Sequence, residues 1–161
     1  MILILLYSND EQVVGRALRG ISHVAIAQGV AVTWEPEEKV TRALERVKEE
    51  LLERWEAEGS GPVFEYAVIK LTEEQYNALR HMARRALDDS ATRLTAELKK
   101  LAADMRRGRG RASELKARFR RLAAETTRLN ETASKLGLYT SALSELQEAF
   151  KEASAEYLKL K

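Results

Sequence analysis

The sequence predicts an α+β protein: a ferredoxin-like βαββαβ sheet followed by a long antiparallel helical hairpin and a third helix. Two observations lead to this fold class. Up to residue 71, β-favouring runs and helical patterns alternate in the order strand, helix, strand, strand, helix, strand. Beyond that point strand-like runs disappear, and apolar residues recur at spacings of three and four. We therefore expect two domains, residues 1–71 and residues 72–161.

An apolar run and its boundary define the first strand and the first helix. Residues 1–7 are continuously apolar, which is typical of a buried central strand. The next three residues, Ser8, Asn9 and Asp10, are of types that cap helices. A short helix is then expected over residues 11–19, and Gly20 stands where it would stop.

Two further strands and a longer helix follow. Residues 23–27 and 30–34 favour strands, and the glycine of the intervening Gln28-Gly29 tolerates the positive φ of a tight hairpin turn. A single bent strand over 23–34 is the alternative. Pro36 and the glutamates after it predict a helix start, and the helix should run to about Glu58 before a fourth strand over residues 63–71. The apolar stripe expected to face the core consists of Val40, Leu44, Val47, Leu51 and Trp55.

Three helices are expected in the remainder of the chain. Thr72 and Gln75 have the spacing of a capping box, and glycines at 108, 110 and 137 separate three apolar seams. Ser113, and either Thr140 or Ser141, are the expected N-caps of the later helices. An antiparallel hairpin with a third helix against it, or a dimeric version, buries these seams most simply. The seams are Leu87, Ala91, Leu94, Leu98, Leu101 and Met105; Leu115, Phe119, Leu122, Thr126, Leu129, Ala133 and Leu136; and Leu143, Leu146, Phe150, Ala153, Tyr157 and Leu160.

Composition narrows the classes of function. The absence of cysteine excludes disulfides, thiolate nucleophiles, iron–sulfur clusters and cysteine-dependent zinc sites. The only two histidines, His23 and His81, fall in different predicted elements, and no nucleophile elbow, phosphate-binding loop or dinucleotide fingerprint occurs. We therefore expect a non-enzymatic protein without a metal or a cofactor. The longest apolar run is far shorter than the roughly 20 residues of a membrane-spanning helix, so we expect a soluble, cytoplasmic protein with no membrane partner.

Positive charge is concentrated in one segment, although the net charge of the chain is only +2. Between Lys99 and Arg128, eleven Lys and Arg stand against three Asp and Glu. The densest stretch, residues 106–111, lies at a predicted helix–helix turn, where glycines would let guanidinium groups settle on phosphates. Such charge attracts phosphate without reading base sequence. The candidate nucleic-acid-binding residues are Arg106, Arg107, Arg109 and Arg111, extended along the next helix by Lys116 and Arg120.

The same cluster also has a structural explanation. A turn needs a soluble sequence, and arginine near the end of a helix complements the helix dipole. Three hypotheses therefore stay open. The first is a nucleic-acid-associated protein, with DNA as the expected partner. The second is a structural or adaptor protein that assembles through its helices with another copy or another protein, and the third is a small-molecule sensor with a groove between sheet and helices.

Several segments of the first 130 or so residues also follow one another in a recognisable order. They are the apolar strand at residues 2–7, the stretches at 17–21 and 27–32, a helix from Pro36, residues 63–65, and the basic stretch 118–122. In this order they resemble the N-terminal domain of chromate-resistance regulatory proteins. The resemblance implies a DNA-associated transcriptional regulator. The sequence departs from that family in lacking an appended histidine- or cysteine-bearing sensing domain, so we do not expect direct chromate sensing.

Overall fold

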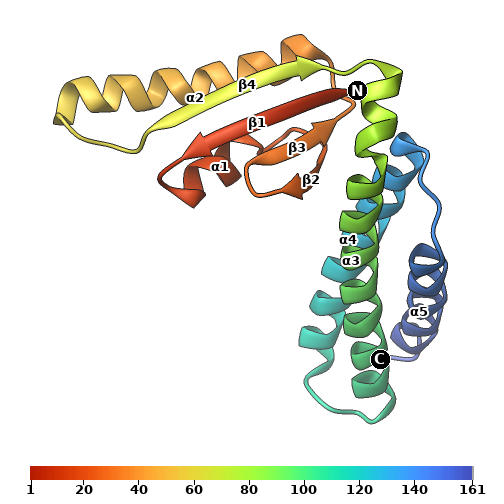
Figure 1. The fold of residues 1–161 in the computed structure, drawn as a ribbon. Helices are drawn as coiled ribbons and strands as arrows, with labels where there is room; N and C mark the ends of the chain where they lie inside the picture. The colour runs from red at the N-terminus through yellow and green to blue at the C-terminus, as the bar shows by residue number, and fades with distance from the viewer. Residues whose placement is uncertain (161) are drawn as a thin grey trace. The chain divides into compact units, whose positions relative to one another are not determined.

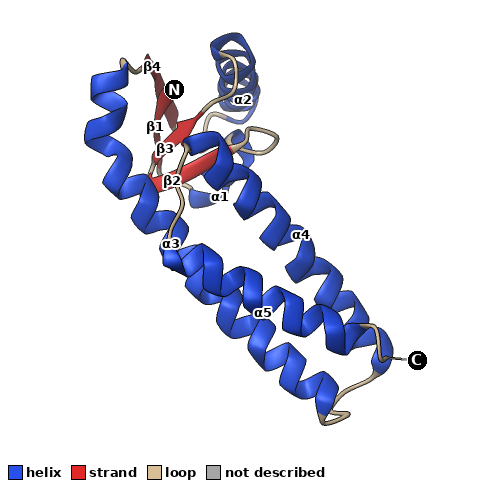
Figure 2. Cartoon of the chain, turned by 90° about the vertical axis from the view of Figure 1, so that its right-hand side faces the viewer, coloured by secondary structure: helices blue, strands red, loops and turns tan. Residues whose placement is uncertain are grey.

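A computed structural model of the chain describes residues 1–160 (Figure 1). Over this range the protein is α+β and mostly helical, with one four-stranded antiparallel sheet and five helices (Figure 2). The elements in chain order are β1 (Ile2–Ser8), α1 (Glu11–Ala17), β2 (His23–Ala27), β3 (Val30–Thr33), α2 (Glu37–Glu58), β4 (Phe64–Lys70), α3 (Glu73–Arg106), α4 (Ala112–Leu136) and α5 (Ser141–Tyr157).

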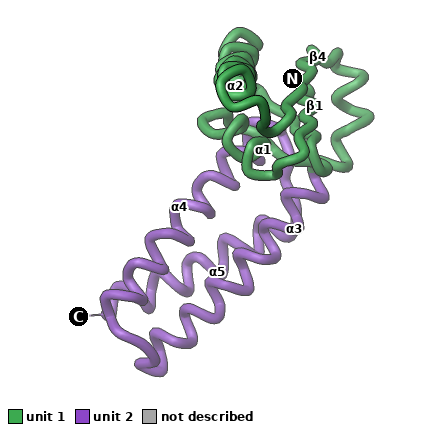
Figure 3. Tube along the Cα trace, turned by 90° about the vertical axis from the view of Figure 1, so that its left-hand side faces the viewer, with its two compact units in different colours: residues 1–83 green, residues 84–161 purple. Residues whose placement is uncertain are grey.

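The chain divides into two compact units, which are coloured separately in Figure 3. Unit 1 comprises residues 1–83 and unit 2 begins at Arg84, so the division falls within α3. The domain limit expected between residues 71 and 72 follows the change from strands to helices. Because α3 continues without a break from Glu73 to Arg106, no loop or linker marks the division between the units.

The sheet of unit 1 has the strand order β2-β3-β1-β4, and every neighbouring pair is antiparallel. Ile4 of the central strand β1 is paired with Ala31 of β3 on one side and with Val68 of β4 on the other. β2 and β3 are separate strands joined through Gln28 and Gly29, which excludes a single bent strand. Their pairing has an irregularity between Ala25 and Ala27.

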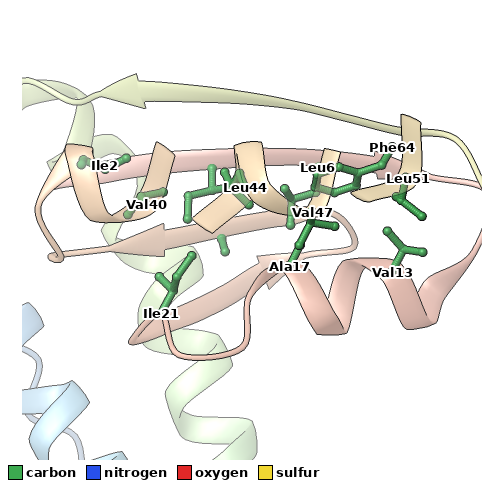
Figure 4. Close-up of a cluster of buried hydrophobic side chains, with 12 residues drawn as sticks. Ile2, Leu6, Val13, Ala17, Ile21, Val40, Leu44, Val47, Leu51 and Phe64 are labelled. Atoms are coloured by element: carbon green, nitrogen blue, oxygen red, sulfur yellow. The ribbon is translucent and has the colours of Figure 1, made fainter. Parts of the chain in front are cut away.

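One face of the sheet is covered by α1 and α2, whose apolar side chains meet those of β1 (Figure 4). Ile2, Ile4 and Leu6 alternate with less buried positions along β1 and point into this core, as the two-residue repeat of a strand requires. The predicted α2 stripe is confirmed over its first four members. The prediction that Trp55 is the fifth buried member is wrong, because α2 has no buried residue after Leu51.

A polar network closes the connection between β3 and α2. Thr33 is fully buried; its hydroxyl donates to the carbonyl oxygen of Ser22 at 2.7 Å and accepts from the backbone N–H of Glu35 at 3.0 Å. The Glu35 carboxylate accepts from the Lys39 ammonium at 3.0 Å and from the Ser22 N–H at 3.4 Å. These hydrogen bonds hold the pKa of Glu35 below its ordinary value, and the one from Lys39 has the largest effect. The start of α2 is thereby tied to the end of β3.

In unit 2, α3, α4 and α5 bury the predicted seams against one another. Each member from Leu87 to Met105 is buried, whereas four members of the other two seams stay half exposed: Leu129, Phe150, Tyr157 and Leu160. Phe119 stacks on Phe150 and on Tyr157, with ring centroids 5.9 and 4.4 Å apart. Aromatic pairs at such distances add to the stability gained from burial.

The helix ends agree with the sequence in part. The capping box is confirmed, since Thr72 and Gln75 exchange side-chain to backbone hydrogen bonds of 2.9 and 3.2 Å. Thr140 is the N-cap of α5. Ser113 is not an N-cap, because α4 begins at Ala112 and Arg111 takes the cap position with no side-chain bond. The first helix is also shorter than expected, ending at Ala17.

Candidate nucleic-acid interface

The α3–α4 turn has a defined backbone geometry. Gly108 adopts a positive φ of 62°, and its N–H donates to the Met105 carbonyl oxygen at 3.2 Å. The Arg109 N–H reaches back to the Asp104 carbonyl oxygen at 2.9 Å. This pair of bonds is a Schellman motif, which ends a helix and satisfies its last carbonyl groups. The glycine-rich stretch is therefore an ordered turn in which Arg107 and Arg109 have fixed backbone positions.

The start of α4 adds further positive potential. Gly110 has a φ of 104° and packs over Leu115, whose side chain would lie 3.6 Å from a Cβ at that glycine. Arg111 follows as the N-cap, and its carbonyl oxygen accepts from the Leu115 N–H at 3.0 Å. Arg111 carries no acceptor side chain, so the first N–H groups of α4 have no side-chain cap, and Glu114 is the acidic residue in this first turn.

Arg106 differs from the other expected phosphate ligands. Its Nη2 donates to Oε1 of Glu152 at 2.7 Å, and its Nε donates to Oε1 of Glu156 at 3.4 Å. Both carboxylates belong to α5. Hydrogen bonds to these carboxylates raise the pKa of Arg106, and the one to Glu152 has the largest effect. The pKa of Glu156 is held below its ordinary value, mainly by the hydrogen bond from Lys159 and also by the one from Arg106. Arg106 thus fastens α5 to the end of α3, and these two carboxylates would compete with any phosphate for its guanidinium group.

The other five candidates have at most a distant carboxylate. Arg107, Arg109, Lys116 and Arg120 have no ion-pair partner among residues 1–160, and Arg111 lies 4.0 Å from Glu114 with its side chain 85% exposed. Lys116 and Arg120 are four residues apart, on one face of α4. We call this set the tip cations: Arg107, Arg109, Arg111, Lys116 and Arg120.

Two of the three remaining arginines of the basic segment are paired with carboxylates of α3 and α4. Arg118 lies 3.6 Å from Asp104, and Arg121 lies 3.6 Å from Glu97 and 3.8 Å from Glu125. Pairing across this helix contact therefore leaves the free charge at the turn and along the first turns of α4. Lys99 and Lys100 of α3 and Arg128 of α4 are also exposed and have no ion-pair partner among the described residues. All three belong to the basic segment, and only the structure distinguishes them from its paired cations.

The two units carry opposite charge. Unit 1 contains nine Lys and Arg against fourteen Asp and Glu, a net charge of −5, whereas unit 2 contains eighteen against eleven, a net charge of +7. Positive potential is thus a property of the unit that holds the tip cations. Such a charge distribution favours association with a polyanion at unit 2.

Other chemistry finds little support in the described part of the chain. Residues 1–160 contain no group of three or more His, Asp or Glu side chains arranged to hold a metal ion. His23 and His81 each place Nδ1 within hydrogen-bond distance of a nearby backbone carbonyl oxygen, that of Ile21 at 2.8 Å and that of Ala78 at 3.0 Å. No helix within this range is both long and apolar enough to cross a membrane.

Comparison with protein-family models, curated proteins and solved structures finds no match for this chain.

Proposed function

We propose that this is a non-enzymatic, nucleic-acid-associated protein that contacts the phosphates of DNA through the tip cations. One observation carries the proposal: five cations on an ordered turn and the adjoining helix have no close carboxylate, while neighbouring arginines are paired. Four of the five have no ion-pair partner among the described residues and Arg111 has only Glu114 at 4.0 Å, so their guanidinium and ammonium groups are available to bind phosphate oxygens. A small transcriptional regulator, working in the cytoplasm without a membrane partner, is the role that we assign to it.

Two features support the phosphate contact. The Schellman motif orders the turn before any ligand binds, so little backbone entropy is lost on association. The N-terminus of α4 adds backbone N–H groups of favourable polarity beside Arg111. The resemblance to chromate-resistance regulatory proteins also implies DNA association.

The proposal extends to the finer topology of both units. We assign unit 1 to the ferredoxin-like arrangement, supported by its βαββαβ element order and its β2-β3-β1-β4 strand order. We interpret α3 and α4 as an antiparallel hairpin. Three ion pairs support this, because they join successively later residues of α3 to successively earlier residues of α4: Arg93–Glu125, Glu97–Arg121 and Asp104–Arg118.

The decisive experiment is a fluorescence-anisotropy titration of labelled duplex DNA at several salt concentrations, with single-stranded DNA and RNA in parallel. If all five tip cations meet phosphates, the slope of log K against log salt should be about −4.5 on duplex DNA. The variant R107A/R109A should make that slope shallower by about 1.8.

A matched variant controls for overall charge. R19A/R42A also removes two exposed arginines that have no acidic partner among residues 1–160, but from unit 1, and should leave the slope unchanged. Equal effects of the two variants, or no saturable binding at low salt, would refute the phosphate contact. Light scattering on the same samples would then test assembly through the helices, which stays a prediction.

A further inference from the structure

The last two turns of α2 extend beyond the part of the helix that packs on the sheet. Leu51 is the last buried residue of α2, and every residue from 52 to 60 is exposed. Two of these are large and apolar: Leu52 is 54% exposed and Trp55 is 47% exposed. Helices in proteins gain most of their stability from a packed face, so these turns contribute little to the fold of unit 1.

Trp55 lies beside the segment that leads into β4. A Cβ placed on Gly61 would lie 3.7 Å from Cε3 of the Trp55 ring, and Val63, two residues further, is 42% exposed. Leu52 precedes Trp55 by three residues, a spacing that makes helical side chains neighbours. We call the neighbouring side chains of Leu52 and Trp55 the α2-end patch.

Negative charge surrounds the patch. The last ten residues of α2 contain five glutamates and one arginine. Of the glutamates, Glu49, Glu53 and Glu56 have no ion-pair partner among residues 1–160, and the first and third flank Leu52 at helical spacings of three and four. Glutamates at the C-terminal end of a helix face the negative pole of its dipole, and the last turn of α2 holds no basic residue to compensate.

Three features of this helix end are therefore unfavourable for an isolated unit: exposure on all sides, apolar groups in water and negative charge at the negative pole. A partner surface that is both apolar and basic would remove all three, because it would cover the helix end, bury its apolar groups and neutralise its negative charge. Sites where local sequence works against local stability are where function is expected.

We propose that the α2-end patch binds a basic amphipathic segment of a partner protein. An apolar side chain of the partner packs on Leu52 and Trp55, and its Arg or Lys side chains pair with Glu49, Glu53 and Glu56. Tryptophan is among the residues that most often dominate binding energy at such contacts. A second copy docking through the same patch would place glutamates against glutamates, and nucleic acid would meet repulsion, so charge selects a cationic protein segment.

The test uses Trp55 as its own reporter. Replacing the only other tryptophan, in W34F, leaves the full-length chain with a single tryptophan in the patch. The emission of Trp55 in the free protein should be that of a solvated indole and should be quenched by acrylamide. A blue-shifted emission that resists quenching would show that the patch is already covered and would overturn the proposal.

The binding probe is a synthetic 18-residue amphipathic peptide of Leu and Arg, with a Leu and Glu peptide of the same pattern as its control. The Leu and Arg peptide should shift Trp55 emission saturably to the blue, and the acidic peptide should not. L52A and the triple variant E49Q/E53Q/E56Q should each weaken binding at least tenfold. All four side chains are exposed, so circular dichroism melts should match those of W34F.

A control at the other end of the same helix isolates the site. E37Q/E38Q also removes exposed acidic charge from α2 and should leave peptide affinity within twofold. Equal losses for this control and the triple variant would mean that general charge attraction holds the peptide, and would overturn the proposal. DNA binding through the tip cations should be unchanged by L52A, which keeps the two functions separable.

Discussion

Gly29 allows a direct measurement of how tightly the β2–β3 turn is held against β1. Its φ is 68°, in the left-handed region, and its carbonyl oxygen accepts from the Leu6 N–H at 2.7 Å. A Cβ at this position would lie 2.3 Å from the carbonyl oxygen of Leu6, a backbone atom that cannot move aside alone. The substitution Gly29→Ala therefore requires the turn or the central strand to shift.

Gly20 provides the matched control. Its φ of 83° is also left-handed, but a Cβ there would have no atom within 4 Å. Gly20→Ala should cost about 1 kcal/mol, for the unfavourable backbone conformation alone. Gly29→Ala pays that cost, loses a hydrogen bond worth about 1 kcal/mol and adds a steric clash, so we expect a loss of about 3 kcal/mol.

Urea unfolding followed by far-ultraviolet circular dichroism measures both free energies of unfolding. Alanine restricts the unfolded chain similarly at both positions, so the difference between the variants isolates the contact with β1. We expect Gly29→Ala to be less stable than Gly20→Ala by about 2 kcal/mol. A difference below about 0.5 kcal/mol would refute the close approach of the turn to Leu6.

Three further predictions concern charge and burial. E152Q/E156Q should release Arg106 and steepen the salt slope of DNA binding by about 0.9, because one more cation can meet phosphate; an unchanged slope would show that Arg106 is not held back by α5. Glu35 has a depressed pKa, so its contribution to stability is present at neutral pH and is lost as pH falls below about 4.3; Glu35→Gln should remove that pH dependence from urea midpoints, and a parallel dependence in both proteins would contradict it. Thr126 is buried with no hydrogen-bond partner for its hydroxyl among the described residues, so Thr126→Val should raise the free energy of unfolding by about 1 kcal/mol, and a lower midpoint would indicate an unseen partner.

The succession of strands and helices could be predicted because it depends on local periodicity. Alternation along β1 and the spacing of Val40, Leu44 and Val47 are properties of a few consecutive residues. Trp55 continues the same spacing and is nevertheless exposed. A periodic stripe shows which face of a helix can be buried, but not where the opposing sheet ends.

The sequence located the candidate site but could not show which of its arginines are paired with carboxylates. A run of arginines between two helical patterns is visible in composition alone. The partners of Arg106 lie 46 and 50 residues later in the chain, and no local pattern links them to it. Similarly, the glycines at 108 and 110 suggested Ser113 as the next N-cap, whereas α4 begins at Ala112 and Arg111 takes the cap position.

The structural explanation of the basic cluster holds for some of its cations and not for others. It accounts for Arg106, which complements the C-terminal pole of α3 and pairs with α5. It does not account for Arg111, which stands at the N-cap of α4, where the helix dipole disfavours positive charge. Nor does it account for Arg109, since any polar residue would suit an exposed turn at that position. Cations kept where the fold alone would disfavour them, and left without close carboxylates, are what a phosphate-binding surface requires.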